Sequence, residues 1–150
     1  MQLTEVDSIC CPPPLFHCFG LVLGLLACIT HGSALVLPSQ TFDPAAVLAA
    51  VVEEKCTGLH GVPTMFVAEL EHFRRKQQQN SRSGLKLRTG IAAGSPVSPA
   101  LMEQLQELLG LPDLTITYGM LSPPLFLLSP PLFSKCLRYL YMESSYFLQE

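Results

Sequence analysis

Two short stretches of the sequence combine residue types that suit the binding of a small molecule. One is Thr89–Pro96, TGIAAGSP, in which small side chains let a ligand approach the backbone and hydrogen-bond its peptide groups. The other is Thr117–Gly119, where an aromatic residue at the end of an apolar run is followed by glycine. Tyr118 is suited there to stacking on a base, and equally to filling the edge of a sheet. The first stretch, taken alone, is also consistent with an ordinary loop from a strand into a capped helix.

A third candidate is His17 in the apolar stretch Pro14–Gly20, PLFHCFG. A lone histidine on an apolar helix is often a hydrogen-bonded core residue, so its type alone leaves its role open. Cys10, Cys11 and Cys18 lie close to it in sequence, but they form no Cys-x-x-Cys pair and a run of prolines stiffens the intervening backbone. We therefore assign no metal site, and the irregular spacing of the cysteines favours a reduced, intracellular chain.

The elements that must position these residues follow from an alternation of helical and strand patterns. Runs of helical length alternate with short apolar runs bounded by glycine or proline. Such alternation with short connections predicts an α/β fold, a partial parallel sheet with covering helices. Helices are predicted over 15–30, 42–56, 62–76 and 98–110, and strands over 33–38, 57–61, 85–94 and 114–119, with 2–10 as a further candidate strand.

Capping residues locate the helix ends. Asp43 and Ser98 are favourable N-caps, and Pro44 and Pro99 suit the first helical position that follows each of them. Gly110 is expected to end the last helix.

Composition excludes some classes of protein. The net charge is −3 and no basic stripe exists to neutralise phosphates, so we expect no nucleic-acid partner. Almost half of the residues are apolar, and residues 8–42 contain no Asp, Glu, Lys or Arg. Glycines and a Thr-His-Gly break interrupt this segment and the chain starts with an acidic MQLTEVD, so a buried helix is predicted there rather than a membrane span or secretory signal.

Four motifs occur in a distinctive order: PLFHCFG, HGVPTMF, GIAAGSPVSPALMEQL and LTITYGM. Together they resemble the AMP-forming acyl-CoA synthetases, members of the adenylate-forming superfamily, and in particular the medium-chain fatty acyl-CoA synthetase branch. The resemblance covers residues 4–120, which we interpret as a partial AMP-binding domain from the large N-terminal domain of such an enzyme. In that family a fatty acid reacts with ATP to give an acyl-adenylate and pyrophosphate, and coenzyme A then attacks the acyl group, with Mg²⁺ as cofactor.

The resemblance also implies site residues. It places Gly94, Ser95, Pro96, Tyr118, Gly119 and Met120 at the nucleotide, with the tyrosine ring on the adenine. It places Phe16, His17 and Gly20 along the acyl channel, where the histidine would help to orient the carboxylate. It identifies no catalytic residue in this chain.

The sequence departs from the family directly after Met120. The family continues with Thr-Glu, which contact the phosphate and Mg²⁺, whereas this chain has Leu121 and Ser122. Leu121 can neither donate a hydrogen bond nor bind a metal. We also expect the phosphate loop upstream of Thr4 and the C-terminal domain to be missing. We therefore predict a fragment of an ATP-dependent fatty acid–CoA ligase that is inactive alone.

Residues 121–150 form a divergent segment in which LSPPLF occurs twice. Its Pro-Pro pairs are incompatible with the interior of a helix or a central strand, so we expect it to be disordered or weakly helical. Two other functions remain open: a non-catalytic acyl-binding protein and a small membrane-associated protein. The family works in peroxisomes, mitochondria or cytosol, and the sequence does not choose between these compartments.

Overall fold

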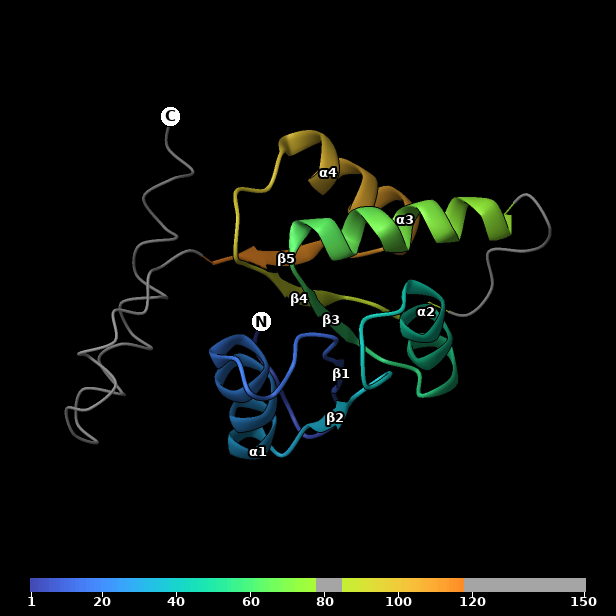
Figure 1. Ribbon diagram of the computed structural model, residues 1–150. Coiled ribbons are helices and arrows are strands. Elements are labelled where there is room, and N and C mark those ends of the chain that lie inside the picture. The colour runs from blue at the N-terminus through green and yellow to red at the C-terminus, as the bar shows by residue number, and fades with distance from the viewer. Residues whose placement is uncertain (78–84, 118–150) are drawn as a thin grey trace.

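The described part of the chain forms a sheet of five parallel strands. The computed structural model describes residues 1–77 and 85–117. Within these residues the strand order is β2-β1-β3-β4-β5, and each neighbouring pair is parallel. The parallel α/β fold predicted from the sequence is thereby confirmed (Figure 1). The strands are β1 (Ser8–Cys10), β2 (Ala34–Val36), β3 (Gly58–Gly61), β4 (Thr89–Ala92) and β5 (Asp113–Ile116).

The helices connect consecutive strands. After β1 the chain forms a π-helical stretch, η1, that continues directly into an α-helix. Single helices lead from β2 to β3 and from β3 to β4, and the connection from β4 to β5 again combines an α-helix with a π-helical stretch, η2. The bounds are η1 (Phe19–Leu26), α1 (Ala27–His31), α2 (Pro44–Glu53), α3 (Pro63–Gln77), α4 (Pro99–Gln104) and η2 (Leu105–Leu109).

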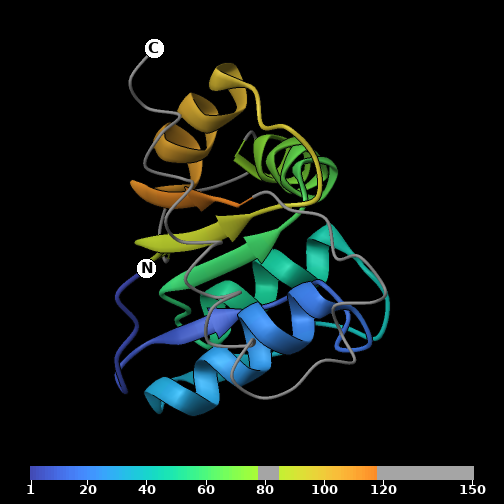
Figure 2. The ribbon, with the colours of Figure 1, turned by 90° about the vertical axis from the view of Figure 1, so that its left-hand side faces the viewer.

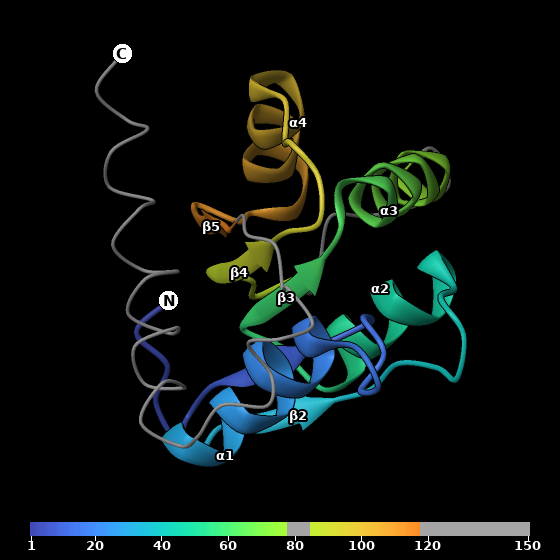
Figure 3. The ribbon, with the colours of Figure 1, turned by 60° about the vertical axis from the view of Figure 1, so that its left-hand side comes forward.

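The two faces of the sheet are covered unequally. Strand β1 sits between β2 and β3, so the crossover through η1 and α1 runs in the opposite direction to the later crossovers. Since parallel crossovers are right-handed, η1 and α1 must lie on one face and α2, α3 and α4 on the other. Figure 3 shows α1 on the side of the sheet away from α2 and α3. The larger hydrophobic core, which includes Cys10, Leu59, Phe66 and Leu114, lies on the side of α2, α3 and α4.

The predicted caps are present. The backbone N–H of Ala45 donates to Asp43 Oδ1 at 3.0 Å, and that of Leu101 donates to Ser98 Oγ at 3.3 Å. A cap of this kind stabilises a helix by about 1 kcal/mol. Gly110, which has a φ of 70°, follows the last helical residue, as expected of a glycine that ends a helix.

Several boundaries differ from the sequence prediction. The first helix begins at Phe19 rather than at residue 15, because the chain turns tightly between Pro14 and His17. The strand predicted over 33–38 is shortened to β2, and it was wrongly predicted to be buried. It is partly exposed because, in the described part of the sheet, it pairs only with β1. The strand predicted over 85–94 is reduced to Thr89–Ala92. Residues 121–150, and the predicted boundary before them, lie outside the described residues.

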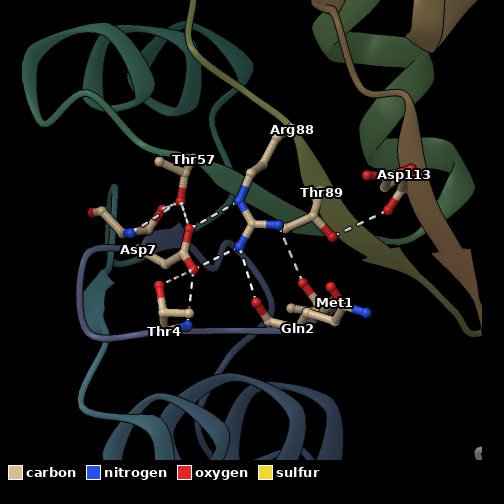
Figure 4. A network of polar contacts seen from close by, with 9 residues as sticks. Met1, Gln2, Thr4, Asp7, Thr57, Arg88, Thr89 and Asp113 are labelled. Atoms are coloured by element: carbon tan, nitrogen blue, oxygen red, sulfur yellow. Dashed lines mark hydrogen bonds and ion pairs between the residues drawn. The ribbon is translucent and has the colours of Figure 1, made fainter.

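An ion pair closes the amino edge of the sheet. Asp7, which precedes β1, is buried and faces Arg88, which precedes β4 (Figure 4). Arg88 Nη2 lies 2.6 Å from Asp7 Oδ2, and Arg88 Nε lies 3.1 Å from Oδ1. Thr57 Oγ1 donates to the same carboxylate at 2.7 Å, and the backbone and side chain of Thr4 add two further hydrogen bonds. This Asp7–Arg88 pair therefore joins the starts of β1, β3 and β4.

Candidate functional site

The carboxyl ends of the strands define the candidate site. In an open parallel sheet, ligands bind outside these ends, near the point where the direction of the crossovers reverses. That point lies here between β1 and β3, because β1 is followed by a helix on one face and β3 by a helix on the other. Figure 2 shows the arrows of β3 and β4 pointing in the same direction, towards this edge.

The predicted nucleotide loop occupies this edge. Gly94, Ser95 and Pro96 follow β4 and are exposed. Gly94 has a φ of 95°, which side-chain-bearing residues rarely adopt, and a Cβ there would lie 3.2 Å from Val62 Cγ1. A glycine at this position therefore lets the loop pack against the end of β3 while its backbone stays open to a ligand.

Backbone hydrogen bonds tie this loop to the neighbouring strands. The N–H of Ala93 donates to the carbonyl oxygen of Gly61 at 3.3 Å, and the N–H of Thr117 donates to that of Ala92 at 2.9 Å. The start of the Gly94 loop thus lies between the ends of β3 and β5. Tyr118, Gly119 and Met120, the other predicted nucleotide residues, lie outside the described residues, directly after this fixed point.

An open apolar cleft of about 470 Å³ lies beside the ends of β1 and β2. Phe16, whose residue exposure is 94%, and Leu37 line it from the two segments that follow these strands. Ser39 and Gln40 supply its polar side chains. The cleft therefore offers an apolar surface at the edge where an acyl group was predicted to bind.

The three predicted acyl-channel residues have different surroundings. Only Phe16 lines the cleft. His17 is exposed, and its Nδ1 accepts a hydrogen bond from the backbone N–H of Phe19 at 3.1 Å, so it satisfies the start of η1. Gly20 is buried, and a Cβ there would lie 2.3 Å from the carbonyl oxygen of Pro14. Gly20 is thus required by the close approach of two backbone segments, and its role toward an acyl group stays a prediction.

Sequence reasoning did not single out His60, which the structure buries completely on β3. Its Nε2 lies 3.1 Å from the carbonyl oxygen of Leu23, and its ring centroid is 5.8 Å from that of Phe19. Burial is the main cause that lowers the pKa of His60 to about 4. A polar residue within an apolar strand was the signal in the sequence that could have marked His60 as a residue needing a buried partner. That partner, Leu23 on η1, is remote in sequence and could not be predicted.

Charged groups are sparse at the carboxyl edge. The Asp7–Arg88 pair lies at the opposite edge, and the segments that follow β1 and β2 carry no charged side chain before Asp43. Across 1–77 and 85–117, the structure contains no group of three or more His, Cys, Asp or Glu side chains able to hold a metal ion. Backbone groups and the hydroxyls of Ser39 and Ser95 are poor ligands for Mg²⁺ without a carboxylate, so this part of the edge does not fit that ion.

A helix that spans a bilayer must be long and strongly apolar. None of the described helices is both long enough and apolar enough to cross a membrane.

Comparison with known proteins places this geometry in context. The sequence profile described as AMP-binding enzyme matches residues 1–120. Acyl-CoA ligase SID4 of Ajellomyces capsulatus is 57% identical over 120 residues, which are 80% of this chain and 20% of that protein. Medium-chain acyl-CoA ligase ACSF2, mitochondrial, of Danio rerio is 38% identical over 112 residues, 74% of this chain and 18% of that protein.

Solved structures share the same fold. O-succinylbenzoate coenzyme A synthetase (MenE) of Bacillus subtilis, in complex with ATP and magnesium ion, superposes with a TM-score of 0.62 at 29% identity. That match covers 80% of this chain and 23% of the synthetase. The chain therefore spans about one fifth of the length of the curated relatives that it matches.

Proposed function

Because the chain belongs to the AMP-binding enzymes, among the AMP-forming acyl-CoA synthetases, we propose that it forms part of the adenine-binding site of an ATP-dependent fatty acid–CoA ligase. In this proposal it supplies the wall of the site that contacts the adenine ring. One observation carries the proposal: the Gly94 loop and the end of β5 meet at the carboxyl edge, joined by the hydrogen bond from Thr117 to Ala92. Tyr118 follows Thr117 directly and, in the proposal, stacks on the adenine that lies along Gly94–Pro96.

The proposed reaction of the whole ligase has two steps. The carboxylate of the acid attacks the α-phosphate of ATP, which releases pyrophosphate and gives an acyl-adenylate. The thiol of coenzyme A then attacks the acyl carbon, and AMP leaves. In this chain the Gly94 loop positions the adenylate and Phe16 contributes apolar surface for the acyl chain; charge neutralisation at the phosphates is assigned to other parts of the ligase.

We further propose that the 150-residue chain by itself does not form acyl-adenylate. Within the described residues no group of three or more His, Cys, Asp or Glu side chains could hold a metal ion, and Leu121 and Ser122 stand where the resemblance predicts the phosphate- and metal-binding Thr-Glu. Displacement at phosphorus depends on positioning and charge neutralisation, so the nucleotide would bind without reacting.

Nucleotide binding and catalysis are tested separately. A fluorescent AMP analogue titrated into the purified chain is expected to bind saturably, and Gly94→Ala is expected to weaken binding about tenfold or more. Gly110→Ala is the matched control, because Gly110 also has a positive φ, 70°, but has nothing within 4 Å and lies at the end of a helix. Equal effects of the two substitutions would refute the proposed role of the Gly94 loop. Pyrophosphate exchange into ATP, with Mg²⁺ and octanoate, is expected to stay at background, and measurable exchange would contradict the proposed inactivity.

The apolar cleft favours a second function, binding of an acyl chain without chemistry. Its lining is mostly proline, leucine and phenylalanine, with Phe16 largely exposed. Saturable binding of a fatty acid that Phe16→Ser weakens, with no binding of the AMP analogue, would favour this function over the ligase fragment. A fatty acid that binds only together with the nucleotide would favour the ligase.

A further inference from the structure

His60 is the polar link between the sheet and the helix on its sparsely covered face. Its Nε2 lies 3.1 Å from the carbonyl oxygen of Leu23, in the π-helical stretch η1. Its ring lies against Phe19, with centroids 5.8 Å apart and planes tilted by 31°. Two residues of η1 therefore contact one side chain of β3.

The hydrogen bond fixes the proton on the imidazole. A carbonyl oxygen can only accept, so Nε2 carries the hydrogen and Nδ1 presents a lone pair. Nδ1 is buried and has no hydrogen-bond partner in the described structure. A second proton would place a charge at a fully buried position, where the cost of burial outweighs the hydrogen bonding that the carbonyl oxygens of Leu23 and Leu59 offer to the ring.

Among residues 1–77 and 85–117, no acidic side chain forms a hydrogen bond or ion pair with His60 that could compensate that charge. The η1 and α1 helices and β2 lie within 8–42, which has no charged residue, and β4 consists of Thr, Gly, Ile and Ala. The titratable groups on this side are the thiols of Cys11, Cys18 and Cys28, the exposed His17, and the exposed His31 at the end of α1. The exposed Glu5 also lies near the end of α1, where a Cβ on Gly32 would be 3.6 Å from its Cβ. Burial raises the pKa of the Cys11 thiol to about 12 and also raises that of the Cys28 thiol, so these two stay neutral in acid. At the amino edge, Asp7 is bound to Arg88, and Asp113 is exposed at the start of β5.

The helix that His60 holds is separate from the larger core. That core gathers residues of α2, α3, α4 and η2 with one side of the strands, and Phe19 is not among them. Regions with few buried apolar contacts can open while the rest of a domain stays folded. The buried side chains of η1 and α1, Phe19 and Cys28, lie outside that core, so opening of these two helices would leave it intact.

We propose that His60 is a proton-sensitive latch: its protonation releases η1 and α1 from the sheet, and with them the carboxyl edge beside β1, while the α2, α3 and α4 side stays folded. The direction of the pH effect follows from the different proton affinities of His60 in the docked and released states. Released His60 has the ordinary affinity for a proton, whereas the docked ring resists protonation, so acid favours the released state. The latch does not depend on which ligand the edge binds.

Amide hydrogen exchange of the 150-residue chain, corrected for the intrinsic pH dependence of exchange, tests the latch. Below pH 6.5 the protection of Phe19–His31 is expected to fall by up to about tenfold per pH unit, towards a limit of about 300-fold that is reached below a pH of about 4, while the protection of α3 is unchanged. His60→Gln keeps a donor for Leu23 but cannot take up a proton, so its protection in the same segment is expected not to fall. His31→Gln, the same change at an exposed histidine, is expected to behave like the unsubstituted chain.

Two outcomes would overturn the latch. One is an equal fall in His60→Gln, and the other is an equal fall in α3, which would mean global unfolding. If His60→Gln does not fold, NMR titration of the His60 ring in the unsubstituted chain decides the matter. The latch requires a ring midpoint near pH 4 that coincides with changes at the η1 amides, and a midpoint near 6.5 or unaffected amides would refute it.

Discussion

Replacing Arg88 with methionine is expected to destabilise the chain far more than a charge deletion on its surface. Methionine keeps most of the length and apolar stem of the arginine, but it removes both charge-assisted hydrogen bonds to Asp7 and those to the carbonyl oxygens of Met1 and Gln2. The Asp7 side chain is only 2% exposed, so its carboxylate stays buried without a counter-charge.

The expected loss in the free energy of unfolding depends on how deeply each side chain of the Asp7–Arg88 pair is buried. Removing one partner of a fully buried pair costs about 3–5 kcal/mol. The Arg88 side chain is 40% exposed, and three hydrogen bonds from Thr4 and Thr57 remain on Asp7, so a loss of about 2–3 kcal/mol is expected. Arg75→Met is the matched control, since Arg75 and Glu71 are 3.7 Å apart with side chains 80% and 60% exposed. That substitution is expected to cost less than about 0.5 kcal/mol.

The assay is urea unfolding followed by far-ultraviolet circular dichroism, with the midpoint compared at constant slope. Burial acts to raise the pKa of Asp7, but hydrogen bonds from Arg88, Thr57 and Thr4 outweigh it and hold the pKa well below its ordinary value of 3.8. The stabilisation by this carboxylate is therefore present above pH 3.8 and is lost as the pH falls through the lowered pKa. The penalty of Arg88→Met should shrink in that acidic range. A penalty equal to that of Arg75→Met, or one that does not vary with pH, would refute the reasoning.

Two further substitutions test the core and the chain crossing at η1. Burial raises the pKa of Glu69 well above its ordinary value of 4.5, and neither of its carboxyl oxygens has a hydrogen-bond partner. Above pH 4.5 the folded chain therefore keeps a proton on Glu69 that the unfolded chain loses. The free energy of unfolding consequently falls as the pH rises above 4.5. Glu69→Gln is expected to remove this slope, up to about 1.4 kcal/mol per pH unit, in urea midpoints measured from pH 4.5 to 8, and an unchanged slope would contradict the assignment. Gly20→Ala is expected to lower the free energy of unfolding by about 1–3 kcal/mol or more in the same assay, because the new Cβ would lie 2.3 Å from the Pro14 carbonyl oxygen and the backbone would have to move. An unchanged free energy of unfolding would show that the backbone segments at Pro14 and Gly20 are packed less tightly than this distance implies.

The sequence was sufficient for features that depend on neighbouring residues. Asp43 and Ser98 fall where the helices start, because an N-cap and a following proline act within one turn. The parallel sheet followed from the alternation of elements, since that alternation leaves few other ways to bury apolar faces.

Features set by pairing between remote segments were not predicted. Periodicity does not reveal that β1 lies inside the sheet and β2 beside it, so β2 was wrongly expected to be buried. The hydrogen bond from His60 to Leu23 and the pairing of Asp7 with Arg88 likewise depend on how the strands align. His17 was singled out as a residue on an apolar helix, whereas the turn after Pro14 places it just before η1.

The strand order has a consequence for how this chain is made. In the described sheet every neighbouring pair of strands is parallel and none is joined by a hairpin, so strand pairing there cannot begin from a short local loop. During synthesis, β1 can pair with β2 only after Ala34 has been added to the chain, and with β3 only after Gly58 has been added. Such distant pairings slow folding and prolong the exposure of apolar segments. The stretch 8–42, which contains no Asp, Glu, Lys or Arg and is synthesised before β3, is therefore where chaperone binding during translation should concentrate.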